Sequence, residues 1–183
     1  MKTYSLKVHT PYDDIKTNYV NVDEDTYIDE RIDNGAIHNS YIVKNGAKLI
    51  INTIIDARNN SINNSQSQII DIYHKVELAS NGAEVSIKVK GVTDKNNKII
   101  YRSNILTDNN YQNLKGEEVL RFVSLSGTAE IDVIPSLEIA NNNINAAHSL
   151  KIEKLDIKRL FYLIVHGIDI DDARGIYVSG LLK

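Results

Sequence analysis

Residues 135–172 read PSLEIANNNINAAHSLKIEKLDIKRLFYLIVHGIDIDD, and the hydrophobic pattern of the chain changes within this stretch. Upstream of it, short segments of β-type alternation are separated by turns rich in Asn and Gly. Downstream of it, apolar residues recur at helical spacing. His148 lies between the two patterns. The stretch therefore predicts a mainly β protein that ends in helices.

Two short amphipathic helices are predicted at the end of the chain. Asp156 is a good N-cap for the first helix, and Gly167 is placed to end that helix in the left-handed conformation. Asp169 or Asp171 would cap the second helix. The expected apolar face of the first helix consists of Ile157, Leu160, Phe161 and Ile164, and that of the second consists of Ile170, Ala173, Ile176, Tyr177 and Leu181. We therefore expect a C-terminal helical hairpin over residues 155–183, following a β core over residues 1–154.

The β core is punctuated by a recurring Asn-Gly-Ala turn signal. Turns are expected at Asn34-Gly35, Asn45-Gly46 and Asn81-Gly82, with Ser126-Gly127 as a variant, and at the segments 11–14 and 141–143. The polar segments 59–68 and 104–115 are expected to be loops. Two architectures are consistent with this pattern of turns. An antiparallel meander or sandwich would use the turns as hairpins, and a parallel β-helix would use them at the corners of its coils.

The residues of the opening stretch resemble a known family. Pro135-Ser136-Leu137-Glu138-Ile139, the segment around His148, Leu155-Asp156, Leu160-Phe161-Tyr162-Leu163 and Ala173-Arg174 are similar to the C-terminal part of the SufB/SufD proteins, which are scaffold subunits of SUF iron–sulfur cluster assembly. Gly116, Leu125-Ser126 and Ala129 are also similar to a segment of this family. The resemblance implies a right-handed parallel β-helix followed by C-terminal helices, and this implication decides between the two architectures.

The resemblance also implies a function and partners. It implies a non-catalytic, SufD-like scaffold subunit that pairs with itself or with a SufB-type protein. It further implies that an ABC-type ATPase similar to SufC docks on the helical hairpin. The predicted docking residues are Leu155, Ile157, Leu160, Phe161, Ile164, Ile170, Ile176 and Tyr177. The hairpin is also expected to cap the open end of the β-helix.

His148 is the one metal-ligand candidate. Imidazole is a competent iron ligand, and the resemblance places this histidine at a subunit interface that holds iron or an iron–sulfur cluster transiently. The alternative is an ordinary polar residue on a strand edge, because many relatives have a Cys where this chain has Ala146. No stably bound cofactor is expected. His9, His38 and His74 are isolated in sequence, and most of them are expected at surface or corner positions.

Composition excludes several functional classes. The 183 residues contain no Cys, so disulfides and thiolate metal ligands are absent. The formal net charge is -3, and the Lys and Arg residues are dispersed without a basic stripe, which argues against a nucleic-acid partner. No phosphate-binding loop, nucleophile elbow, signal peptide or membrane-spanning run is present, so we expect a cytoplasmic protein that is not an enzyme. The alternative function is a structural or protein-interaction β-helix module that has lost its metal chemistry.

Overall fold

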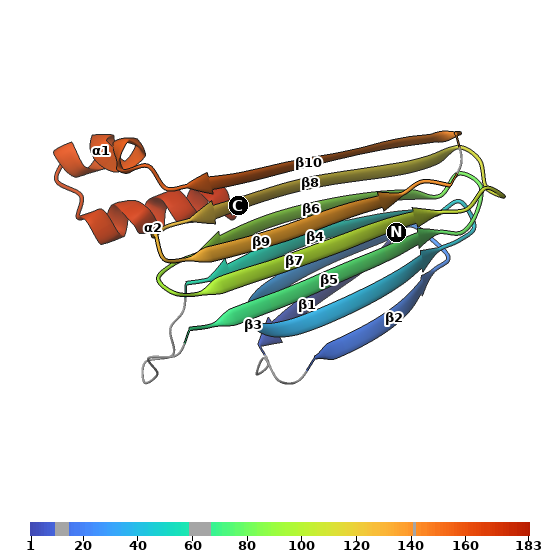
Figure 1. Cartoon of the computed structure of the whole chain (residues 1–183), viewed down its shortest axis with the longest axis horizontal. Coiled ribbons are helices and arrows are strands. Elements are labelled where there is room, and N and C mark those ends of the chain that lie inside the picture. The colour runs from blue at the N-terminus through green and yellow to red at the C-terminus, as the bar shows by residue number, and fades with distance from the viewer. Residues whose placement is uncertain (10–14, 59–66, 141) are drawn as a thin grey trace.

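A computed structural model describes residues 1–9, 15–58, 67–140 and 142–183. The elements follow one another as ten strands and two helices (Figure 1). The strands are β1 (Lys2–His9), β2 (Lys16–Val22), β3 (Thr26–Val43), β4 (Lys48–Ala57), β5 (Ile69–Leu78), β6 (Glu84–Thr93), β7 (Lys98–Thr107), β8 (Leu114–Ser124), β9 (Glu130–Glu138) and β10 (Ile144–Lys154). The helices are α1 (Ile157–Val165) and α2 (Ile170–Leu181). No helix in these ranges is long and apolar enough to cross a membrane.

Every strand pairing in the described ranges is parallel, as a β-helix requires. The first sheet contains β1, the first half of β3, β4, β6, β8 and β10, and the second contains β2, the second half of β3, β5, β7 and β9. The chain alternates between these two sheets, so each coil contributes one strand to each sheet. Parallel neighbours cannot be joined by tight hairpins, which excludes the antiparallel meander. The predicted β-helix with two C-terminal helices is confirmed.

The coils differ in length. Along the first sheet, Thr26 pairs with Leu49, Lys48 with Glu84, and Leu114 with Ile144, so successive partners lie 23, 36 and 30 residues apart. This variation explains why the sequence shows no fixed repeat.

The core lies between the two sheets and is filled by stacked side chains. Parallel register places Ile28, Ile51 and Ile87 in one interior row, and all three are buried. A second row from the other sheet contributes Ile37, Ile72 and the fully buried Tyr101. Alternate residues of each strand face outward, as strand geometry requires.

The predicted turns are partly confirmed. Gly46 and Gly82 have positive φ angles of 66° and 73° in adjacent turns, where the Gly46 amide donates to Ser80 Oγ. The turn expected at Asn34-Gly35 is wrong, because Gly35 (φ 91°) lies inside β3, where it lets one strand pass from the first sheet to the second. The loop expected over 104–115 is shorter, because β7 continues to Thr107 and β8 begins at Leu114. The turn expected at 11–14 lies outside the described residues, as do Asn141 of the turn at 141–143 and most of the loop expected at 59–68.

The helical hairpin has the predicted caps. Asp156 Oδ1 accepts from the Lys158 amide at 3.0 Å, and Asp169 Oδ1 accepts from the Asp171 amide at 2.8 Å. Gly167 has a φ of 86°, and the amides of Gly167 and Ile168 donate to the carbonyls of Ile164 and Leu163. This pattern is the Schellman ending expected from a glycine after the last helical turn.

The hairpin does not cap the open end of the β-helix. Val178 and Leu181 of α2 pack instead on Val92, Val123 and Leu125, at the ends of β6 and β8. Figure 1 shows the hairpin beside the carboxyl ends of β8 and β10. Val92 and Val123 stand on the outer face of the first sheet, because the residues before and after them face the core. The last coil, formed by β9 and β10, is left largely exposed.

The apolar face predicted for α2 is also partly wrong. Ala173, Val178 and Leu181 are buried, whereas Ile176 is 51% exposed. At about 100° per residue, Ile176 points about 135° away from the centre of the face formed by these three buried residues.

Candidate functional site

His148 stands on the free edge of the first sheet. It belongs to β10, which pairs only with β8 among the described strands. Register aligns His148 with Glu118 and Ile87, and both of these residues face the interior. The histidine therefore lies on the interior side of the last coil, where no described strand covers it, and it is exposed. The predicted strand-edge position is correct.

Glu118 is the neighbour of His148 on the interior side. Its side chain is 1% exposed, and Oε1 accepts a hydrogen bond from the Tyr101 hydroxyl at 3.2 Å. Burial raises the pKa of this carboxyl above its ordinary value, and the Tyr101 hydrogen bond offsets part of the rise. Its other oxygen, Oε2, is buried without a hydrogen-bond partner in the described structure. This oxygen is the one unsatisfied carboxylate atom on the interior side of the last two coils.

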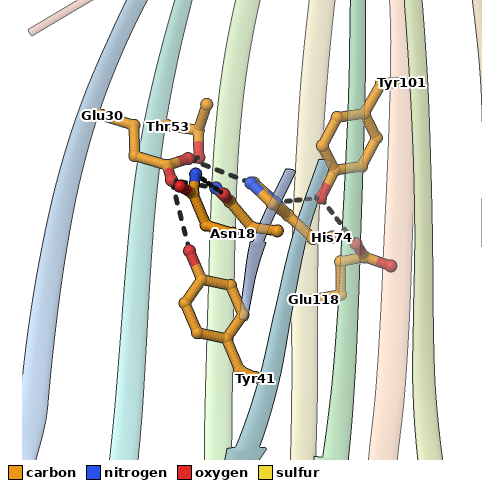
Figure 2. Close-up of polar contacts among 8 residues, drawn as sticks. Asn18, Glu30, Tyr41, Thr53, His74, Tyr101 and Glu118 are labelled. Carbon is orange, nitrogen blue, oxygen red and sulfur yellow. Dashed lines mark hydrogen bonds and ion pairs between the residues drawn. The ribbon is translucent and has the colours of Figure 1, made fainter. Parts of the chain in front are cut away.

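A chain of polar contacts continues from Glu118 through the core to the first coil (Figure 2). Tyr101 Oη lies 3.2 Å from His74 Nδ1, and His74 Nε2 lies 3.0 Å from Glu30 Oε2. Asn39 donates to Glu30 Oε1 at 2.7 Å, and Asn18 donates to Asn39 at 2.8 Å. The chain of contacts thus extends from β2, at one end of the β-helix, to β8, beside the other end.

Glu30 is the anionic centre of this network. Besides His74 and Asn39, its carboxylate accepts hydrogen bonds from the Thr53 hydroxyl at 2.9 Å and the Tyr41 hydroxyl at 3.4 Å. Burial by itself raises the pKa of Glu30, but His74 and the hydroxyl donors outweigh it and hold the pKa below the ordinary value. The same burial, together with the negative charge of Glu30, raises the pKa of Tyr41 far above its usual range, so Tyr41 is a neutral donor. A buried carboxylate with four partners is compatible with an otherwise apolar core.

The sequence did not reveal this network. His74 was expected at a surface or corner position, but its side chain is fully buried. The expectation is correct for His38, which is half-buried on the outer face against the Tyr73 ring. The side chain of His9 lies outside the described residues. The sequence pattern contains a hint of this burial. In each strand, the residues two positions before and after Glu30, Thr53 and His74 are apolar and buried, so strand alternation points these polar side chains into the core.

The described residues do not by themselves form a metal site. No group of three or more His, Asp or Glu side chains within the described ranges could hold a metal ion. His148 and Glu118 offer one nitrogen and one carboxylate on adjacent strands, which is a donor set that iron accepts but that a second chain would have to complete.

The helical hairpin presents a separate apolar surface. Ile157, Phe161 and Ile176 are 61%, 64% and 51% exposed. Of the other predicted docking residues, Leu155, Ile164, Ile170 and Tyr177 are half-buried, and Leu160 is buried. Leu160 therefore supports the hairpin from within, and the exposed surface is formed by its neighbours.

Comparison with known proteins identifies similar chains. Residues 39–181 match the family described as SUF system FeS cluster assembly, SufBD core domain. An iron–sulfur cluster assembly SufBD family protein of Archaeoglobus fulgidus is 28% identical over 141 residues, which are 77% of this chain and 36% of that protein. The iron–sulfur cluster assembly protein SufB of Bacillus subtilis is 25% identical over 108 residues, which are 59% of this chain and 23% of that protein. A SufBD family protein of Staphylococcus epidermidis is 25% identical over 119 residues, which are 65% of this chain and 26% of that protein. The matched region thus spans about a quarter to two fifths of these curated relatives.

Proposed function

Because the chain belongs to the SufBD core family of the SUF iron–sulfur cluster assembly system, we propose that it is a non-catalytic scaffold subunit of that system. It pairs with a second copy or a SufB-type protein through its last coil, and it docks a SufC-like ABC-type ATPase through the helical hairpin. It acts in the cytoplasm and holds iron or an iron–sulfur cluster only as transient cargo.

The observation that carries the pairing proposal is the unfinished last coil. Both β9 and β10 have a free edge among the described strands, so their backbone amides and carbonyls on that side have no strand partner. Leu150 and Ile152 align with the buried residues Leu120 and Phe122, yet they are 40% and 49% exposed. An interior row that ends in exposed aliphatic side chains beside free backbone groups supports pairing with another sheet edge.

The docking proposal rests on the exposed aromatic and aliphatic surface of the hairpin. Phe161 and Tyr162 are adjacent exposed aromatics on α1, 64% and 69% exposed, and such residues often dominate the energetics of interfaces. The packing of α2 on β6 and β8 holds this surface in a fixed position.

Co-elution with a SufC-type ATPase from the same organism tests the docking proposal. Size-exclusion chromatography with light scattering should give a stable complex, and Phe161→Asp should abolish it because a carboxylate cannot be desolvated in an apolar contact. Tyr19→Asp, at an 83% exposed aromatic on β2, is the matched control and should leave the complex intact. Absence of a complex at micromolar concentration with well-folded protein would contradict docking.

The second candidate function is a protein-interaction module without metal chemistry. It is favoured by the lack of Cys and by the lack of a group of three ligands in the described residues. Iron titration of the paired complex distinguishes the two functions. The scaffold with cargo should show an iron-dependent absorption band that disappears in His148→Ala, whereas the module should bind its partners with no such band.

A further inference from the structure

A row of cations crosses the outer face of the first sheet. Parallel register aligns one residue from each of its six strands: Lys151 of β10, Arg121 of β8, Lys90 of β6, Ile54 of β4, Arg31 of β3 and Lys7 of β1. On the four inner strands β3, β4, β6 and β8, the residues that flank this row, among them Ile32, Val89 and Leu120, are buried in the core. Alternation therefore points the cations outward. We call these five residues, Lys7, Arg31, Lys90, Arg121 and Lys151, the basic row.

The positive charge of the basic row is only partly neutralised. Arg121 and Lys151 share Glu153, which also binds Arg159. Hydrogen bonds from Lys151 and Arg159 lower the pKa of Glu153 to about 2, so it is fully ionised at neutral pH. Lys7, Arg31 and Lys90 form no ion pair within the described part of the chain. Asp56, which lies beyond Ile54 on β4, already binds Arg58.

The next row of the same face adds a further cation. Lys88 of β6 is exposed and aligns with Asn52, Asp29 and Val119. Asp29 is the one acid of that row, and it accepts from Asn52 at 2.9 Å. The face is therefore locally positive in a chain whose formal net charge is -3.

The spacing of the row fits a helix. Neighbouring strands lie about 4.8 Å apart, so the six strands span about 24 Å. One turn of an α-helix rises about 5.4 Å, and acidic residues at i, i+3, i+4 and i+7 form one face with this repeat. A helix laid across the strands would thus place about one carboxylate on each cation. Ile54, which is 8% exposed, lies in the middle of the row and lines a pocket of about 170 Å³ with Leu182. Lys7 and Arg31 line the same pocket together with Asp33 and Asp56, so its apolar part is flanked by both signs of charge.

We propose that the basic row is a docking surface for the acidic face of a helix in a partner protein. Nucleic acid fits the row less well, because single-strand sites combine cations with aromatic side chains on which bases stack. The basic row and the Lys88 row contain no aromatic residue. The basic row reaches the pairing strand β10 only at Lys151, so variants on β1, β3, β6 and β8 test this surface separately from the pairing edge.

Synthetic helical peptides test the proposal without any SUF partner. The probe is an alanine-rich helix with glutamates on one face, and the comparison probe has the same composition with glutamates distributed around the helix. Fluorescence anisotropy at low salt should show tighter binding of the one-faced peptide. Lys7→Gln/Arg31→Gln and Lys90→Gln/Arg121→Gln should each weaken it about fivefold, as expected for two lost surface ion pairs.

Control double variants show whether a loss of peptide binding is specific to the basic row. Lys44→Gln/Lys75→Gln removes the same charge outside the first sheet and should leave the affinity unchanged. Lys7 and Arg31 are exposed, so their double variant tests the row even if the half-buried Lys90 and Arg121 prove necessary for folding. Equal binding of the two peptides, or an equal loss in all three double variants, would overturn the proposal. Tighter, row-dependent binding of single-stranded oligothymidylate would assign the surface to nucleic acid instead.

Discussion

At the residue scale, the unusual feature of this protein is a buried line of polar side chains in an aliphatic core. His74 and Tyr101 connect Glu30 to Glu118, and all four side chains are essentially inaccessible to solvent. Glu30 and Glu118 have pKa values shifted in opposite directions. Burial raises the pKa of Glu118, whereas at Glu30 the contact with His74 and the Thr53 and Tyr41 hydroxyls outweigh burial and lower the pKa. The two carboxyls therefore contribute to stability with opposite dependence on pH.

The sign of the Glu30 contribution follows from its lowered pKa. The ionised Glu30 carboxylate stabilises the folded protein fully at pH values above the ordinary pKa of a glutamate. This stabilisation is lost as the pH falls through the lower pKa that Glu30 has in the folded protein. Glu30→Gln should lower the free energy of unfolding at pH 7 by about 3 kcal/mol, because it removes the buried carboxylate that contacts His74 and accepts from Asn39, Thr53 and Tyr41, and it leaves buried donors without an acceptor. The difference in the free energy of unfolding between Glu30→Gln and the unmodified protein should become smaller as the pH is lowered.

Urea unfolding followed by circular dichroism at several pH values measures this effect. Glu77→Gln is the matched control, because Glu77 is an exposed residue of β5, and its loss should change stability by less than about 0.5 kcal/mol. Equal effects of the two substitutions would show that the Glu30 network does not stabilise the core.

At the scale of the elements, close packing between coils limits which residues the strands tolerate. Gly91 of β6 pairs with Phe122 of β8, and a Cβ added at Gly91 would lie 2.4 Å from Phe122 Cδ1. The glycine leaves space for an aromatic ring that is fully buried and packs on Tyr101 with centroids 5.9 Å apart. The small residue in β6 and the large residue in β8 thus fit each other.

Gly91→Ala should therefore destabilise the protein by about 1–3 kcal/mol, the usual cost of overpacking a core. Gly127→Ala adds the same methyl group where no atom lies within 4 Å, and it should be nearly neutral. Thermal unfolding of both variants measures the difference. If Gly91→Ala were as stable as Gly127→Ala, the Phe122 ring would have to move at no cost, which would contradict tight packing between these coils.

At the scale of the whole molecule, the β-helix is open at its last coil, and the hairpin stands to one side of the opening (Figure 1). A helix over the opening would block pairing, whereas a hairpin at the ends of β6 and β8 leaves both surfaces accessible. In this arrangement the proposed pairing and the proposed docking do not compete for the same surface.

Leu150→Asp should disrupt pairing through the last coil, because it places a charge in the exposed end of the interior row. Val119→Asp is the matched control, since Val119 is also 40% exposed but lies on the outer face of β8. Sedimentation velocity of the paired complex should show dissociation for Leu150→Asp alone. A complex that survives Leu150→Asp would place the pairing surface elsewhere.

The sequence by itself determined the features that depend on neighbours in the chain. Asp156, Gly167 and Asp169 marked the ends of the helices because capping involves residues only two to four positions away. The residues around His148 identified the family and, through it, the β-helix. The tertiary structure decided what depends on register between coils. Coils of 23 to 36 residues have no constant period, so the sequence could not show that Glu30, His74 and Glu118 meet in the core. For the same reason, Lys and Arg residues that are dispersed along the chain form a basic row only after parallel pairing aligns them.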